Sequence, residues 1–239
     1  MKLQGEKFYT LAAVLGLGLL SATFTSCDLH DDDYYDLPPA ANVDIIHSSP
    51  KAPYLDASFD ANRLYLNYFD YLKHTGYQRA WQGNRTFTVY YRNSGMPIVE
   101  KSISLQNDKH YSVFITDTLS KTDIVLLRDS TRYASGDSLR IRFANMSPDV
   151  PAMDFYIQGK DEPVATNVPY KQAVDFASLK AANNVVFEAR AAGQSTVLAT
   201  SVKTDLVPQG VYTVWTSGFK GATDDARVTI GRMRHSWRY

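Results

Sequence analysis

Residues 47–56 read HSSPKAPYLD, and 98 residues later residues 145–154 read NMSPDVPAMD. The shared pattern is Ser-Pro-x-x-Pro-x-x-Asp, with its prolines and aspartates at Pro50, Pro53, Asp56, Pro148, Pro151 and Asp154. Proline lacks a backbone N–H and fixes φ, so it favours strand ends and edges. The repeated motif is therefore predicted to end one strand, cross in an extended link and restart pairing at the aspartate, which can accept backbone N–H groups. A metal or ligand role for the aspartates is the alternative, but nothing nearby supplies further oxygen ligands at suitable spacing.

The self-match continues beyond the motif. TFTVYYRNSG (86–95) corresponds to VVFEARAAG (185–193), and HYSVFI (110–115) corresponds to VYTVWT (211–216). Short alternating runs that are rich in aromatic and β-branched residues and are closed by turn residues predict strands. A repeat near one hundred residues with several strands in each copy predicts tandem domains.

The expected fold class is all-β, with two tandem immunoglobulin-like antiparallel β-sandwich domains. They are predicted at residues 41–128 and 139–239, with a polar linker at 129–138. The linker allows the domains either to hinge or to pack together through Tyr133.

Two local expectations accompany this fold. Alternation in the run VYTVWTSG predicts that Val214 and Trp215 face opposite sides of a sheet. Residues 175–184, DFASLKAANN, are the candidate for a short helical turn.

Residues 1–26 are expected to be a lipoprotein signal peptide, because Lys2 and Lys7 precede an apolar run over residues 11–20 and small residues follow it. A membrane span needs about 20 apolar residues, which argues against the alternative of an uncleaved anchor helix. Cys27 is the single cysteine of the chain. Its context FTSC resembles the lipobox of bacterial lipoproteins, with phenylalanine in place of the usual leucine, and implies lipid attachment at Cys27.

Residues 27–40 form an acidic stretch, CDLHDDDYYDLPPA. Low hydrophobicity with like charges predicts a solvated tether. The same run also resembles the surface-export signal of some Gram-negative lipoproteins. The expected location is the cell envelope, as an outer-membrane lipoprotein that faces outside and contacts the membrane through the lipid on Cys27.

The second copy carries NMSPDVPAMDFYI, NVPY, EARAAG and GVYTVWTSG. This combination looks like domain-of-unknown-function family 4397 (DUF4397), over about residues 41–235. The first copy departs from the pattern, because HYSV replaces GVYTV. The resemblance implies a secreted or surface-attached β-sandwich that usually occurs in tandem, and it implies no catalytic residues.

Composition narrows the function. Lys plus Arg and Asp plus Glu each number 25, so no global field favours nucleic acid, and no nucleic-acid partner is expected. The five histidines show no metal-ligand spacing, and neither a metal nor a cofactor is expected. Nucleophile-elbow and phosphate-loop motifs are also missing from the sequence. An enzyme, such as a glycan-processing one whose carboxylates have no fixed spacing, is the third-ranked hypothesis.

The stretch RLYLNYFDYLKHTGYQRAW (63–81) is far more aromatic than its counterpart in the second copy. It supplies the candidate binding surface, formed by Tyr65, Tyr68, Tyr71, Tyr77 and Trp81. These rings either close the core or the domain junction, or they contact a glycan or protein partner.

The C-terminal stretch RMRHSWRY (232–239) is predicted to be a strand with arginines on one face. It is either an edge strand with solvated arginines or a strand that pairs with a partner. The residues of the candidate contact are Arg232, Arg234, Trp237 and Arg238. Three Asp-Ser/Thr triplets resemble O-glycosylation sites of some Gram-negative periplasms, at Thr118, Ser130 and Ser138.

These features favour a non-catalytic binding or adhesion module for a glycan or protein. A structural spacer or assembly subunit of a surface complex is the alternative.

Overall fold

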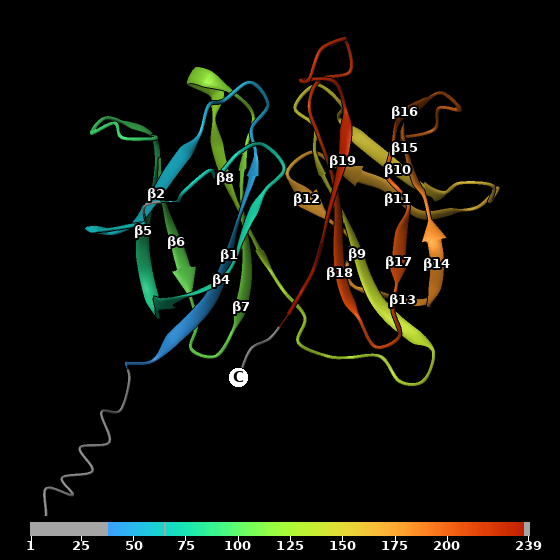
Figure 1. Cartoon of the computed structure of the whole chain (residues 1–239), viewed down its shortest axis with the longest axis horizontal. Coiled ribbons are helices and arrows are strands. Elements are labelled where there is room, and N and C mark those ends of the chain that lie inside the picture. Colours follow the sequence, from blue (N-terminus) through green and yellow to red (C-terminus); the bar gives the residue numbers. More distant parts are fainter. Residues whose placement is uncertain (1–37, 65, 237–239) are drawn as a thin grey trace, which may run out of the picture. The chain divides into compact units, whose positions relative to one another are not determined.

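A computed structural model describes residues 38–64 and 66–236. They form two β-sandwiches that follow one another along the chain, with one short 3-10 helix, η1 (Leu119–Lys121) (Figure 1). The predicted all-β sandwich class is confirmed.

The first sandwich consists of two four-stranded sheets, with the strand orders β4-β1-β7-β8 and β3-β2-β5-β6. The first sheet contains β1 (Ala40–Ser48), β4 (His74–Trp81), β7 (His110–Thr116) and β8 (Asp123–Arg128). The second sheet contains β2 (Leu55–Phe59), β3 (Asn62–Leu64), β5 (Gly83–Tyr91) and β6 (Pro97–Leu105). Val43, Phe87 and Ile115 are among the buried residues that form the core between these sheets.

The second sandwich repeats this plan. Its sheets have the orders β12-β9-β18-β19 and β11-β10-β15-β16, with β13 also paired to β9 and a separate β14-β17 pair. The first of these sheets contains β9 (Ser138–Met146), β12 (Gln172–Ala173), β13 (Ala177–Lys180), β18 (Val211–Ser217) and β19 (Thr229–Arg234). The other strands are β10 (Ala152–Ile157), β11 (Pro163–Pro169), β14 (Ala182–Val185), β15 (Phe187–Ala191), β16 (Val197–Thr200) and β17 (Thr204–Leu206). Phe143, Phe155 and Val214 belong to its core.

Each copy pairs its first strand in parallel with a late strand, β1 with β7 and β9 with β18. The register repeats, since Val43 lies opposite Tyr111 and Ile141 lies opposite Tyr212. The remaining ladders between described strands are antiparallel. A constant-type immunoglobulin domain places its first two strands in one sheet. Here β1 and β2 lie in different sheets, so the immunoglobulin-like detail of the prediction is not confirmed.

In the sheets that contain β1 and β9, the strands β1, β7, β9 and β18 are buried on both faces along most of their length. In β18, Val214 points into the core of the second sandwich, whereas Trp215 points into a third apolar cluster, which confirms the predicted alternation. That cluster, the junction core, consists of Ile46, Phe114, Val125, Ala144, Met146, Trp215 and Met233. The rings of Phe114 and Trp215 meet there edge to face, with centroids 5.6 Å apart. In Figure 1 these two sheets lie between the sheets of β5 and β15.

Two segments differ from the sequence expectations. The predicted helical turn at 175–184 is wrong, because β13 and β14 occupy most of it. Leu179 pairs with Leu139, so the open edge of β9 satisfies backbone groups that an isolated turn would leave to water. Tyr133 in the linker is 54% exposed, and the junction core forms elsewhere.

Candidate functional site

The motif aspartate of the first sandwich joins two loops. The Asp56 side chain, 2% exposed, accepts the backbone N–H of Leu66 at 3.2 Å and that of Asn93 at 3.3 Å. Arg63 adds an ion pair to the same carboxylate at 3.3 Å. The loop after β3 is therefore held beside the turn between β5 and β6.

Asp154 has the same role in the second sandwich. Its carboxylate accepts the backbone N–H groups of Asn167 at 2.7 Å and Gly193 at 2.9 Å. The motif prolines lie in the links between strands, with Pro50 and Pro53 between β1 and β2, and Pro148 and Pro151 between β9 and β10. Within the described ranges, no group of three or more His, Cys, Asp or Glu side chains is arranged to hold a metal ion.

The residue that opens the motif differs between the copies but makes equivalent contacts. His47 Nδ1 accepts the backbone N–H of Ser49 at 3.3 Å, and its Nε2 lies 3.4 Å from the carbonyl oxygen of Pro53. Asn145 accepts the backbone N–H two residues later at 3.0 Å and donates to the carbonyl of Val150 at 2.9 Å. Both side chains tie the strand end to the proline link. Burial lowers the pKa of His47 to about 4.

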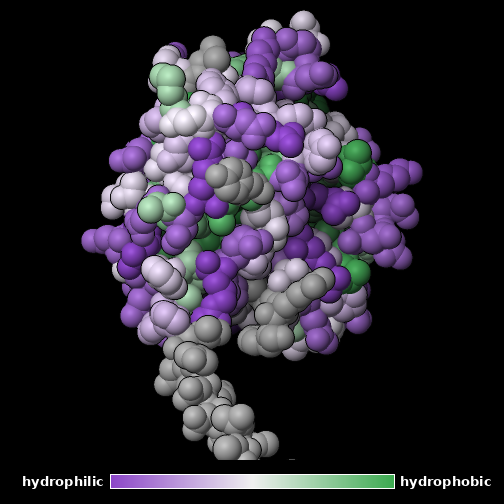
Figure 2. Space-filling view, turned by 60° about the vertical axis from the view of Figure 1, so that its left-hand side comes forward, coloured by the Kyte–Doolittle hydropathy of each residue, from purple (hydrophilic) through white to green (hydrophobic). Residues whose placement is uncertain are grey.

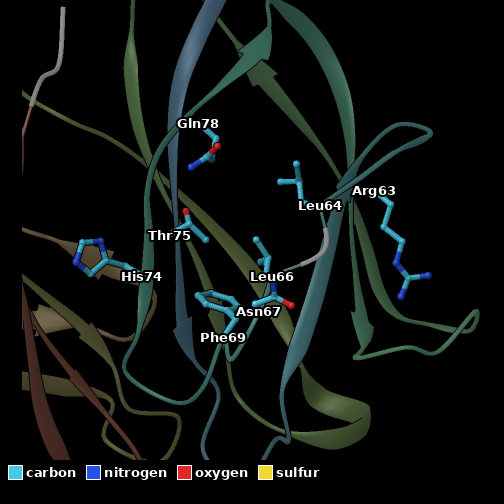
Figure 3. A pocket seen from close by; sticks show the side chains of 8 residues that line it. All are labelled: Arg63, Leu64, Leu66, Asn67, Phe69, His74, Thr75 and Gln78. Carbon is cyan, nitrogen blue, oxygen red and sulfur yellow. The ribbon is translucent and has the colours of Figure 1, made fainter.

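A pocket of about 520 Å³ opens between the edge strands β3 and β4 (Figure 3). Its lining residues are Arg63, Leu64, Leu66, Asn67, Phe69, His74, Thr75 and Gln78. In Figure 3 the apolar members lie between the strand that carries Thr75 and Gln78 and the strand that carries Arg63. The pocket thus combines an apolar floor with a polar rim, and all eight residues belong to the aromatic stretch that distinguishes the first copy.

His74, at one side of this pocket, is held by Asp44. Its Nδ1 lies 2.9 Å from a carboxylate oxygen of Asp44, which is buried. This hydrogen bond raises the pKa of His74.

Tyr68 lies between two pocket residues in sequence and is 71% exposed. Its ring meets that of Tyr54, which is 39% exposed, edge to face at 6.0 Å. The guanidinium carbon of Arg92 lies 5.2 Å from the Tyr68 ring centroid and 5.7 Å from the Tyr54 centroid. We call Tyr54, Tyr68 and Arg92 the tyrosine–arginine group. The Asp56 carboxylate holds the members of this group near one another, because it accepts a backbone N–H from each of the two loops that carry Tyr68 and Arg92.

The second sandwich provides an internal comparison for Tyr68. Leu72 and Lys171 each donate a backbone hydrogen bond of 2.8 Å to the residue that opens the motif in their copy, which aligns the two loops with an offset of 99 residues. Tyr68 then corresponds to Asn167, and their φ angles are 54° and 50°. Asparagine tolerates this left-handed conformation, whereas a bulky residue is strained in it. The first copy therefore keeps a large exposed ring where the backbone favours a small polar residue.

The other two members also have counterparts. The Arg92 N–H donates to the Tyr54 carbonyl at 2.9 Å, and the Ala192 N–H donates to the Ala152 carbonyl at 3.0 Å. The second sandwich therefore has the same backbone with alanine in both places. Sequence reasoning missed Tyr54 and Arg92, although an alignment of the copies around the motif aspartate would have singled them out.

The five aromatic residues predicted as a binding surface do not share one face. Tyr71 is half-buried, with its ring 6.1 Å from that of His47, and burial raises its pKa to about 12. Tyr77 points toward the domain junction, and Trp81, 56% exposed, lies at the far end of β4. Tyr65 lies outside the described residues.

Tyr77 belongs to a buried polar network between the sandwiches. Its hydroxyl donates to Asp129 at 2.7 Å and lies 2.6 Å from His235 Nδ1. Asp129 forms an ion pair with Arg142, and the hydroxyl of Thr213 lies 2.7 Å from His235 Nε2. Burial lowers the pKa of His235 to about 4 and raises the pKa of Tyr77. For Tyr77, the structure shows the junction role that the sequence left open.

The C-terminal strand β19 is the last strand of its sheet. Arg232 and Arg234 are exposed on it, whereas Met233 is buried. Trp237 and Arg238 lie outside the described residues. Pairing of this strand with a partner stays a prediction.

The predicted modification sites occupy different environments. The hydroxyl oxygen of Thr118 is buried, Ser130 lies between β8 and β9, and Ser138 begins β9. Cys27, the predicted signal peptide and most of the predicted acidic tether lie outside the described residues.

Figure 2 shows one face of the molecule, on which hydrophobic residues form separate spots among hydrophilic ones. No broad apolar patch is visible on the described part of that face. Among the described residues, no helix has the length and apolar character needed to cross a membrane.

Comparison with curated proteins gives no match. Among solved structures, family 41 carbohydrate-binding modules from streptococcal virulence factors, which recognise alpha-glucan, align over 80% of this chain and 96% of theirs, with 10% identity and a TM-score of 0.27. A streptococcal virulence factor that binds alpha-glucan aligns over 80% of this chain and 97% of its own, with 11% identity and a TM-score of 0.24. Similarity this low carries no argument about the present chain.

The sequence profile of the family described as Domain of unknown function (DUF4397) matches residues 41–156 and 141–230. The two matches together span both sandwiches and more than half of the chain. The chain therefore belongs to the DUF4397 family and carries two tandem copies of its domain.

Proposed function

We propose that this chain is a lipid-anchored outer-membrane protein that faces outside and acts as a non-catalytic glycan-binding module. The tyrosine–arginine group of the first sandwich is the observation that carries the proposal. Exposed tyrosines offer apolar ring faces for stacking and hydroxyl groups for hydrogen bonds, the combination that a sugar ring requires. The second sandwich has Ala152, Asn167 and Ala192 at the aligned positions, which marks the group as an addition to the shared scaffold.

A binding screen tests the glycan part. The full chain, purified in detergent, is applied to a glycan array beside Tyr68→Asn, which introduces the residue that the second copy uses at this backbone conformation. Wild-type binding that falls at least about tenfold in Tyr68→Asn supports the proposal, since loss of a stacked ring costs on the order of 1–2 kcal/mol. Tyr133→Ala removes an exposed tyrosine of the linker and is expected to bind as the wild type does.

Two results would contradict the glycan proposal. One is an array without any wild-type binding. The other is binding that Tyr68→Asn leaves intact.

The anchor and orientation are tested separately. Cys27→Ala is expected to move the chain from the membrane fraction to the soluble fraction, because the lipid provides the membrane affinity. Protease added to intact cells is expected to digest the wild-type chain. Retention of Cys27→Ala in the membrane overturns the anchor, and protection in intact but not lysed cells overturns the outward orientation.

A structural spacer or assembly subunit is the second candidate. The junction core favours it, because a load-transmitting subunit needs its two domains joined by a buried contact. Arg232 and Arg234 on the edge strand would make the contact with a neighbouring subunit. If the chain is an assembly subunit, reversing both charges is expected to abolish its association with the neighbouring subunit. If the chain is a glycan-binding module, the same change is expected to leave glycan binding unchanged.

A further inference from the structure

Arg92 is a half-buried arginine whose guanidinium has no carboxylate partner among the described residues. Arg63, Arg85 and Arg190 are also half-buried, and each forms an ion pair with an aspartate or glutamate at 2.9 to 3.3 Å. Arg92 lies instead over the two tyrosine rings. A positive charge held in place by ring faces, without an internal counter-ion, complements an anion supplied from outside.

The geometry of the group favours a planar anion. An arginine that lies over aromatic rings keeps its edge N–H groups available as donors. Those donors match the two oxygens of a carboxylate, and the resulting bidentate pair is stronger than a neutral hydrogen bond. Tyr68, largely exposed beside the guanidinium, presents a ring face to the remainder of such a ligand.

Nearby acidic groups do not oppose an anion at this position. Asp56 is buried, pairs with Arg63 and accepts two backbone N–H groups. Asp70, on the same loop as Tyr68, accepts the backbone N–H of Tyr71. Neither of these two carboxylates is therefore paired with Arg92.

Tyr68 keeps its strained backbone conformation although asparagine is used at the same position in the second copy. Strained residues of this kind persist where the surrounding structure holds them, and they concentrate at functional sites. The strained backbone and the exposed ring of Tyr68 thus occur beside the Arg92 charge, which has no carboxylate partner among the described residues, and this combination is found in the first sandwich.

We propose that the tyrosine–arginine group recognises an acidic sugar, whose ring stacks on Tyr68 while its carboxylate pairs with Arg92. This inference rests on the proposed glycan-binding function and specifies the ligand class for it. The second sandwich, with Ala152, Asn167 and Ala192 at the corresponding positions, lacks this specificity.

The test uses a panel of uronic-acid and sialic-acid oligosaccharides, each beside its methyl ester, which keeps the sugar and removes the charge. Binding to the detergent-purified full chain is measured by calorimetry at low and high salt. We expect at least one acid to bind about tenfold or more tighter than its ester, since a hydrogen bond to a charged group contributes on the order of tenfold or more in affinity. The preference should shrink at high salt.

Variants taken from the second copy locate the effect. In Arg92→Ala, the affinity for the acidic oligosaccharide is expected to fall to that for its methyl ester. In Tyr68→Asn, the affinities for the acid and for the ester should both fall. Arg132→Ala removes one exposed arginine of the linker and serves as the charge-matched control, with binding unchanged.

The outcomes separate the two proposals. Acid and ester that bind equally, with both lost in Tyr68→Asn, overturn the acidic-sugar inference and leave the glycan proposal standing. An acid preference that survives Arg92→Ala also overturns the inference. Binding to no member of the panel overturns the inference, and binding to no glycan on the wider array overturns the proposed function as well.

Discussion

At the scale of single residues, the two copies reach one hydrogen-bond arrangement with different side chains. His47 and Asn145 both accept a backbone N–H two residues later and both reach a carbonyl of the proline link. The position requires an acceptor and a donor at the right separation, which an imidazole and a carboxamide both provide. The copies can therefore be used to design substitutions that preserve the fold.

His47→Asn is expected to change the free energy of unfolding at pH 7 by less than about 1 kcal/mol, because the new side chain can make both contacts that Asn145 makes. His47→Leu should cost about 1–3 kcal/mol, since it leaves the buried N–H of Ser49 and the carbonyl of Pro53 without that partner. Urea unfolding of both variants measures the difference. Equal losses in the two variants would show that imidazole packing, rather than the hydrogen bonds, matters at this position.

At the scale of secondary-structure elements, the pairing of β18 with β19 depends on one glycine. Gly231 lies opposite Trp215, and a Cβ at this glycine would come within 2.3 Å of the indole ring. The ring is fully buried and belongs to the junction core, so it has little room to move. Because Gly231 has no side chain, the indole ring of Trp215, the largest side chain of the junction core, can pack against β19 at this position.

Gly231→Ala is expected to destabilise the chain by about 1–3 kcal/mol or more, because overpacking forces the indole or the strand to shift. Near-ultraviolet circular dichroism should change with it, since Trp215 loses its packing. The control is Gly221→Ala, where a Cβ would meet nothing within 4 Å. A Gly231→Ala variant as stable as Gly221→Ala would show that the strand pair adjusts freely.

At the scale of the whole described unit, the junction between the sandwiches is built from equivalent groups used twice. The Ser217 hydroxyl donates to the Ser48 carbonyl at 2.8 Å, and the Thr116 hydroxyl donates to the Met146 carbonyl at 3.0 Å. The two donors are the last residues of equivalent strands, Thr116 of β7 and Ser217 of β18. The two acceptors are also the last residues of equivalent strands, Ser48 of β1 and Met146 of β9. Such reciprocal contacts are the pattern of an isologous interface between identical subunits. Here the two halves belong to one chain.

The junction also contains a group that makes stability depend on pH. His235 is neutral in the folded state, because its Nε2 can accept from Thr213 and its Nδ1 can donate to the Tyr77 oxygen. Its pKa of about 4 lies below the usual value of about 6.5, so between these values the unfolded chain binds a proton that the folded chain does not. Stability is therefore complete above about pH 6.5 and falls as the pH drops toward 4. His47 contributes in the same direction, whereas the raised pKa of His74 acts in the opposite one.

His235→Gln is expected to reduce the pH dependence of stability, with the contribution of His47 remaining. Between pH 7 and pH 5 the wild-type histidine accounts for a loss of about 2 kcal/mol, estimated from its lowered pKa. Urea unfolding at several pH values in this range, above the titration of ordinary carboxylates, measures the slope for both proteins. An unchanged slope in His235→Gln would mean that other groups cause the acid sensitivity.

Much of the fold could be predicted from the sequence, and the candidate site could be predicted only in part. The repeated motif, the alternating runs and the family resemblance identified two β-sandwiches and the strands around Val214 and Trp215. The aromatic stretch 63–81 was recognised as an addition to the first copy, and Tyr68 within it belongs to the site. The helical turn at 175–184 was wrong because an open sheet edge overrode local preference.

The period of the strands and the places where prolines end them follow from residues that are neighbours along the chain, and the duplication follows from the repeated motif. The burial of both faces of β18, the contact of Tyr77 with Asp129 and His235, and the position of Arg92 over Tyr54 could not be predicted in this way. The physical reason is that these contacts join residues that are far apart in the sequence. They are set by sheet pairing and by the packing of one sandwich against the other, which no local pattern encodes.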